Sequence, residues 1–183
     1  MTGKTPLKLK VGDKAPDFRF ETPWESGLEF YEAVGEKPSI LVFLRYYGCP
    51  VCQMEMANLR REIHLFKQKR AQTFLILQSS PATIASLADK EDWPFTIICD
   101  PQSKVFQLYH VEPGGIFKLM HPAGLLAAIK ATFQGFRHGK FEGKETQLPA
   151  AFVMAPDNAI KFVRYGKNIT DVPTPATLAA NID

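Results

Sequence analysis

Residues 38–56 read PSILVFLRYYGCPVCQMEM, where a β-branched and aromatic run stops at a Gly-Cys-Pro turn and a helical pattern begins. The run 38–47 has the length of a strand, and its nearly continuous apolar character is typical of a strand buried on both faces of a parallel sheet. Proline is favoured at the first position of a helix, because its missing N–H costs nothing there. This stretch therefore predicts a central strand that feeds a helix through a turn carrying two cysteines.

The same strand-to-helix pattern recurs twice. TFLILQ (73–78) and FTIIC (95–99) are apolar runs of strand length, and Ser80-Pro81 and Asp100-Pro101 follow them. Ser or Asp before the proline can cap the free amides of a helix. Helices are therefore expected over residues 50–70, 81–91 and 101–110. Strands that alternate with helices predict a mostly parallel sheet covered on both sides.

The last third of the chain breaks this alternation. An insertion is expected over about 113–147, with a helix over 116–134 and a Gly/Lys loop over 135–146. AAFVMA, PDN and AIKFVRY (150–165) then predict an antiparallel hairpin, and TPATLAANI predicts a last helix. The expected fold class is α/β, a three-layer α/β/α sandwich with a mixed central sheet and a helical insertion before the C-terminal hairpin.

Length and charge narrow the classes of function. A chain of 183 residues fits one domain, so 1–183 is expected to be a single unit. A net charge of +3, with acids and bases interspersed, does not favour a nucleic-acid partner. The N-terminal residues lack the apolar region of a secretory signal, and no apolar run is long enough to cross a bilayer. A soluble, cytoplasmic protein without a membrane partner is therefore expected.

The CPVC spacing places Cys49 near the N-cap of the expected helix and Cys52 in its first turn. Free N–H groups and the positive end of the helix dipole stabilise a thiolate there, and Arg45 can lower the thiol pKa further. A zinc site would need two more ligands, but only Cys99 and four scattered histidines remain. We therefore expect neither a metal nor a cofactor, and redox chemistry is favoured over two merely structural thiols.

These residues resemble the thioredoxin-fold, peroxiredoxin-like proteins of the AhpC/TSA type. VGDKAPDF (11–18) is similar to the opening segment of that family, FLRYYGCPVCQME (43–55) to its active-site strand, turn and helix, and QLPAAFVMAPDNAIKFVRYG (147–166) to its closing hairpin. The resemblance covers almost the whole chain. It implies a thioredoxin-like fold and a thiol-dependent oxidoreductase that acts on peroxide or disulfide substrates.

Two positions of the family signature differ. Where peroxiredoxins carry Pro-x-x-x-Thr-x-x-Cys, this chain has Arg45, Cys49 and Cys52 at the three positions. Pro149 stands where the family has an arginine, and the Leu148-Pro149 step is similar to the cis-proline of thioredoxins. Such a bond would expose a backbone edge to a disulfide substrate.

The resemblance leaves open which cysteine attacks first. In a thioredoxin-type mechanism, Cys49 would be an exposed nucleophile and Cys52 the resolving thiol. In a peroxidase mechanism, Cys52 would be the residue that is oxidised to sulfenic acid, and Cys49 would be the resolving thiol. Both routes end in a Cys49–Cys52 disulfide, which a thioredoxin- or glutathione-type reductant would reduce. The alternative function is a non-catalytic redox-sensing or binding module of the same fold.

Several other residues are candidates for the site. Glu55 shares a helix face with Cys52 and is expected either to relay a proton, to pair with Arg45, or simply to favour the first helical turn. Cys99 is either a third redox thiol or a small core residue. Further candidates for substrate contact are Tyr46, Tyr47, Arg137, His138, Arg164 and Tyr165.

The insertion carries its own prediction. Its apolar stripe is expected to pack on the sheet, to form a contact of a homodimer, or to cover the substrate; the stripe comprises Phe117, Met120, Leu125, Ile129 and Phe133. We expect the loop within the insertion, residues 135–145, to set which substrate reaches the sulfurs.

Overall fold

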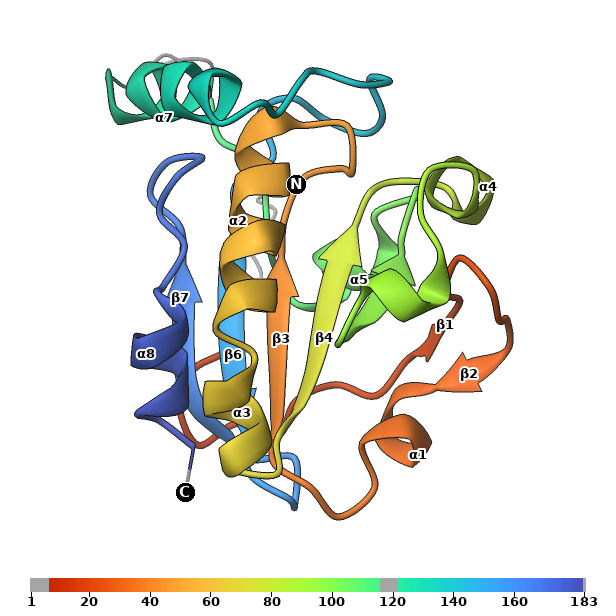
Figure 1. The fold of residues 1–183 in the computed structure, drawn as a ribbon. Helices are drawn as coiled ribbons and strands as arrows, with labels where there is room; N and C mark the ends of the chain where they lie inside the picture. Colours follow the sequence, from red (N-terminus) through yellow and green to blue (C-terminus); the bar gives the residue numbers. More distant parts are fainter. Residues whose placement is uncertain (1–6, 116–121, 183) are drawn as a thin grey trace, which may run out of the picture.

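The core of the molecule is a five-stranded mixed sheet with the strand order β5-β4-β3-β6-β7 (Figure 1). A computed structural model describes residues 7–115 and 122–182 of the chain. β3, β4 and β5 run parallel, whereas β6 is antiparallel to β3 and β7 to β6. The strands are β3 (Ser39–Phe43), β4 (Gln72–Leu77), β5 (Thr96–Cys99), β6 (Ala150–Met154) and β7 (Ile160–Tyr165).

Helices cover both faces of this sheet. One apolar core lies beneath α2, α3 and α8, and the other packs against α1, α5 and the N-terminal segment. A two-stranded sheet of β1 (Arg19–Phe20) and β2 (Leu28–Glu29) flanks the β5 edge. The helices are α1 (Phe30–Val34), α2 (Pro50–Arg61), α3 (His64–Gln68), α4 (Pro81–Ala85), the 3-10 helix η1 (Lys90–Asp92), α5 (Lys104–Leu108), α7 (Pro122–Phe133) and α8 (Pro175–Ala179). The predicted α/β class and mixed central sheet are confirmed.

Strand β3 is buried over its whole length, as its sequence predicts. Ile40 and Val42 enter the core beneath α2, while Leu41 and Phe43 enter the opposite core. A strand with both faces buried needs apolar residues at consecutive positions rather than at alternate ones. This central strand delivers the two cysteines to the edge of the sheet at which the parallel strands end.

The predicted helices are shorter in the structure. The helix expected over 50–70 breaks at Glu62 and Ile63, where Ile63 N–H donates to Arg60 O and Leu65 N–H to Glu62 O, which are the tighter i→i+3 bonds of a 3-10 turn. The helix expected over 81–91 ends at Ala85. α5 begins at Lys104 instead of Pro101, because residues 101–103 form a turn in which Ser103 adopts a positive φ of 55°.

The predicted caps are present with one difference. Pro50 and Pro81 occupy the first turns of α2 and α4, and the Ser80 hydroxyl accepts a hydrogen bond from Thr83 N–H at 3.2 Å. The buried Asp100 carboxylate reaches over the turn and accepts bonds of 2.8 to 3.1 Å from the first amides of α5. Burial raises the pKa of this carboxyl, and the three amide bonds oppose that rise.

The insertion lies beyond the end of the sheet that carries the cysteines. α7 packs against α2 near its first turn rather than on the sheet (Figure 1). Ile129 and Phe133 are exposed, and Phe133 is 88% accessible, so the prediction that they pack on the sheet is wrong. Phe117 and Met120 lie outside the described residues. Among the described residues, no helix is long and apolar enough to span a bilayer.

We predict that Asp100→Ala destabilises the fold. The substitution leaves three amides of α5 without their acceptor and should lower the free energy of unfolding by about 2 kcal/mol. Asp100→Asn keeps one side-chain acceptor and should lose less. Urea denaturation followed by circular dichroism measures both changes, and equal stability of the Ala variant and the parent protein would contradict the assigned role.

Candidate active site

The two cysteines lie at the junction between β3 and α2, where the sequence predicts them. Cys49 is the N-cap of α2 with an extended backbone (φ −79°, ψ 122°), and Pro50 begins the helix. Cys52 N–H donates to the Cys49 sulfur at 3.4 Å, so the thiol takes the position of a capping oxygen. All three cysteines of the chain are free thiols in this structure.

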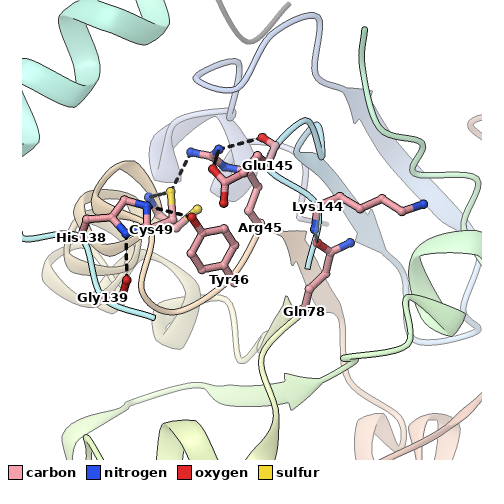
Figure 2. Close-up of polar contacts among 9 residues, drawn as sticks. Arg45, Tyr46, Cys49, Gln78, His138, Gly139, Lys144 and Glu145 are labelled. Atoms are coloured by element: carbon pink, nitrogen blue, oxygen red, sulfur yellow. Dashed lines mark hydrogen bonds and ion pairs between the residues drawn. The ribbon is translucent and has the colours of Figure 1, made fainter. Parts of the chain in front are cut away.

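The guanidinium of Arg45 connects the Cys49 sulfur to a distant loop (Figure 2). Arg45 Nη2 donates to Cys49 Sγ at 2.8 Å. Arg45 Nη1 donates to the carbonyl oxygen of Glu145 at 2.8 Å and to its carboxylate at 3.2 Å. Arg45 is buried, so its positive charge acts on both groups with little screening by solvent.

The pairing expected between Glu55 and Arg45 is wrong. Glu145 supplies the carboxylate on Arg45, whereas Glu55 hydrogen-bonds Asn58 and lies near Lys130 of α7. Burial raises the pKa of Glu55. A role for Glu55 as a proton relay stays a prediction.

The two thiols differ strongly in acidity. The pKa of Cys49 falls from its ordinary value of 9.0 to about 6, first because Cys52 hydrogen-bonds its sulfur and then because of the charge of Arg45; burial opposes both effects. Burial instead raises the pKa of Cys52 well above 9.0, and its hydrogen bond to Cys49 adds to the rise. These opposite shifts favour the thiolate on Cys49 and the proton on Cys52.

A loop from the insertion covers this pair. Gly139 N–H donates to Gly48 O at 2.8 Å, and a Cβ on Gly48 would lie 2.6 Å from Lys140 O, so the two backbones touch. His138 Nε2 lies 3.0 Å from the Tyr46 hydroxyl. Cys49 and Cys52 are both buried beneath these contacts. The expectation that Cys49 is an exposed nucleophile is wrong for this closed arrangement.

Further along, the loop is held by two more anchors. The Thr83 hydroxyl donates to the Glu142 carboxylate at 2.7 Å, and Ser80 N–H reaches the same oxygen at 3.4 Å. Lys144 N–H donates to Gln78 Oε1 at 2.9 Å. The Lys144 side chain itself points away from Cys49 (Figure 2). Residues 137–145 are thus fastened to the ends of β3 and β4 and to the first turn of α4.

The Leu148–Pro149 peptide is trans, so the predicted cis-proline is wrong. Pro149 is buried, and its carbonyl accepts from Gly166 N–H at 2.8 Å. The backbone edge expected for a disulfide substrate is therefore occupied by the chain itself. Leu148-Pro149 therefore does not correspond to the thioredoxin cis-proline, because Pro149 extends the pairing between β6 and β7.

Some of the remaining candidates lie at the site, and others make contacts elsewhere in the molecule. His138 and Tyr46 lie over the cysteines, and the Arg137 carbonyl accepts from Gln53 Nε2 at 3.1 Å. Arg164 instead pairs with Asp171, and the Tyr165 hydroxyl donates to Tyr109 O.

Cys99 is a buried core residue at the end of β5. Burial is the largest cause that raises its pKa to about 12. The sheet order places β5 two positions from β3. In residues 7–115 and 122–182, no group of three or more His, Cys, Asp or Glu side chains is arranged to hold a metal ion.

Glu145 and Glu142 were missed by sequence reasoning. Glu145 lies 100 positions from Arg45, in a loop whose glycines and lysines indicate only irregular structure. The sole sequence signal was the length of the insertion before the closing hairpin.

Comparison with known families identifies the family of this chain. The model of the AhpC/TSA family matches residues 11–163. The chain belongs to the AhpC/TSA family. The predicted kinship with peroxiredoxin-like enzymes is thereby confirmed. A putative peroxiredoxin (bcp) of Buchnera aphidicola subsp. Schizaphis graminum is 26% identical over 109 residues, which are 60% of this chain and 68% of the relative.

Solved structures show the same fold. Peroxidoxin BcpB from Mycobacterium tuberculosis superposes with a TM-score of 0.70 at 17% identity, covering 95% of this chain and 96% of that one. A peroxiredoxin-like protein from Aquifex aeolicus gives 0.67 at 15% identity, with coverage of 97% and 88%. A yeast mitochondrial 1-Cys peroxiredoxin, whose thiol is resolved via glutathione/thioredoxin systems, gives 0.57 at 17% identity, with coverage of 87% and 68%.

The lowered pKa of Cys49 predicts a pH profile. Alkylation of Cys49 by iodoacetamide, followed by peptide mass spectrometry, should rise with a midpoint near pH 6, because the thiolate is the reactive form. Arg45→Gln removes the adjacent charge and should raise that midpoint by about 1 pH unit or more. Arg61→Gln, at the exposed end of α2, is the control and should leave it unchanged. A common midpoint in all three proteins would contradict the role of Arg45.

Proposed function

We propose that this protein is a thiol-dependent peroxidase in which Cys49 attacks the peroxide and Cys52 resolves the product. The observation that carries the proposal is the contact between Arg45 Nη2 and the Cys49 sulfur. It supports a thiolate at Cys49 at neutral pH, whereas the proton stays on Cys52. Membership of the AhpC/TSA family supports peroxide as the substrate class.

The reaction divides into two balanced steps. The Cys49 thiolate attacks one oxygen of ROOH, the O–O bond breaks, and a proton converts the leaving alkoxide to ROH while Cys49 becomes sulfenic acid. Cys52 then attacks the Cys49 sulfur, an S–S bond forms, and the hydroxyl leaves as water with the proton of Cys52. Arg45 stabilises the thiolate before the attack and lies beside the sulfur at which negative charge changes.

This order of attack differs from the alignment with the peroxiredoxin signature, which places the peroxidatic cysteine at Cys52. The reason is that the two thiols have different surroundings: the amide of Cys52 and the guanidinium of Arg45 both donate to the sulfur of Cys49. Cys49 stands at the signature position that holds the threonine in peroxiredoxins.

Disulfide exchange is the second candidate function. The same Cys49 thiolate within a CPVC turn supports attack on a disulfide sulfur. The trans, internally paired Pro149 does not offer the backbone edge that was expected for a disulfide substrate. We further propose that a thioredoxin- or glutathione-type reductant regenerates the Cys49–Cys52 dithiol. A cytoplasmic location and a homodimer stay predictions.

Single-cysteine variants test the order of attack. Treated with hydrogen peroxide and dimedone, Cys52→Ser should accumulate the sulfenic-acid adduct on Cys49, because the resolving thiol is gone. Cys49→Ser should give no adduct and no turnover with hydrogen peroxide and thioredoxin. Cys99→Ser is the matched control and should keep turnover, since its thiol is buried and protonated.

Two other results would contradict attack by Cys49 on a peroxide. An adduct on Cys52 in the Cys49→Ser protein would show that the alignment, rather than the Arg45 contact, identifies the attacking residue. Turnover of insulin disulfides without turnover of hydrogen peroxide would favour exchange.

We predict that the loop limits access to Cys49. Glu142→Gln weakens the charge-assisted bond to Thr83 while leaving Arg45 untouched, so the loop should open more often. Loss of about 1.4 kcal/mol at this anchor corresponds to an alkylation rate at Cys49 about tenfold higher. A time course of iodoacetamide labelling at a fixed pH, quenched at intervals, measures this rate.

Lys144→Gln is the control for that experiment. Lys144 lies in the same loop, but its side chain points away from the site, so the labelling rate should stay at the parent value. Equal rates in the parent, Glu142→Gln and Lys144→Gln proteins would show that the loop does not limit access, and the expectation that residues 135–145 set the substrate would fall with it.

A further inference from the structure

A pocket of about 570 Å³ lies at the end of the sheet opposite the cysteines. Its walls come from the β1–β2 sheet, from α3, and from the first residues of β4 and β5. Cys49 follows the carboxyl end of β3, whereas this pocket lies at the amino ends of strands that run parallel to it. The pocket is therefore separate from the proposed active site.

The wall of this pocket is strongly aromatic. Trp24 and Trp93, the two tryptophans of the chain, both line it, together with Phe20, Phe74 and Phe95. The Trp93 and Phe95 rings pack with their centroids 5.4 Å apart. Sites for small organic molecules have volumes of about 300 to 1,000 Å³ and walls of this kind. A flat apolar ring system matches such a wall, because rings pack against rings with little loss of rotamer freedom.

Two buried polar groups in the same wall have no hydrogen-bond partner. They are the hydroxyl of Thr73 and the indole N–H of Trp93. Buried groups of this kind are normally paired, so an unpaired one indicates a missing partner. Both can donate to an oxygen acceptor. Because both atoms are covered in the ligand-free arrangement, a ligand oxygen reaches them only when the surrounding side chains shift.

The rim of the pocket carries an excess of positive charge. Lys67 and Lys90 line it, against the single carboxylate of Glu25, which lies 3.9 Å from the Lys90 ammonium. Lys67 forms no ion pair within residues 7–115 and 122–182. Arg60 adds a further cation over the Trp93 ring, 5.9 Å from its centroid. An anionic group on the ligand is favoured over a neutral or cationic one.

We propose that this pocket binds a small aromatic carboxylate, with the ring against the tryptophans and the carboxylate toward Lys67 and the unpaired donors. The aromatic wall matches the ring of such a molecule. The unpaired donors and the positive rim match its carboxylate. Trp93 also packs edge-on against Tyr47, with centroids 6.1 Å apart, and Tyr47 lies two residues before Cys49. The site is independent of the proposed peroxidase reaction.

The tryptophans make the proposal directly testable, because both indole N–H groups report on this pocket. We expect 2-naphthoate, titrated into the full-length protein labelled with nitrogen-15, to shift both indole signals in a saturable manner. The neutral analogue 2-naphthalenemethanol should bind about tenfold more weakly, since it lacks the charge. No saturable shift at either indole signal, or equal affinity for the two compounds, would overturn the proposal.

Three variants localise the effect. Lys67→Gln should weaken 2-naphthoate binding by about threefold to tenfold, and Thr73→Val should weaken it while raising the midpoint of thermal unfolding, because the unpaired hydroxyl is gone. Lys144→Gln, at the other end of the molecule, should bind as the parent does. Parent-like affinity in Lys67→Gln would overturn the proposal even if Thr73→Val fails to fold, since the exposed Lys67 side chain is not needed for folding.

Discussion

The buried guanidinium of Arg45 is the interaction on which the closed site depends. A positive charge removed from water requires anionic or strongly polar partners. Arg45 finds two of them, the Cys49 sulfur and Glu145, and they come from segments far apart in the chain. Each partner stabilises the same cation, so the ionisation of the thiol and the position of the loop are energetically linked through one side chain.

This linkage favours the ionised form of a buried thiol. Burial raises the pKa of a cysteine and is the largest cause of the raised pKa of Cys52 and of Cys99. Cys49 is equally enclosed but lies at a helix N-terminus, with the Cys52 thiol and amide and one guanidinium around its sulfur. The closed loop excludes water from this shell and so strengthens each of these contacts. The same closure buries Cys49, so the proposed reaction requires the loop to move before a peroxide reaches the sulfur.

Local patterns were enough to predict the strand-to-helix turn, the parallel strands and the positions of Cys49 and Cys52, because each depends on residues within one or two helical turns. Contacts across the chain were not predictable. Nothing near Arg45 indicates that Glu145 rather than Glu55 is its partner, since a loop is positioned by its anchors and not by periodicity. The start of α5 was misplaced for a related reason: the Asp100 carboxylate caps across a three-residue turn instead of beside Pro101.

The apolar stripe of α7 shows a further limit. Period 3.6 in the sequence identifies a helix with an apolar face, but it does not say what covers that face. The structure places the helix on α2, at the end of the sheet, and leaves Phe133 in solvent.

The contact between Gly48 and the loop backbone has an evolutionary consequence. Closure over the cysteines is tight because a side chain is missing at Gly48, with Lys140 O only 2.6 Å from where its Cβ would lie. A single change to alanine there would wedge the loop outward without touching a sulfur, Arg45 or either anchor. One codon can thus reset how open this site is, and through Arg45 it also shifts the ionisation of Cys49 without replacing either thiol.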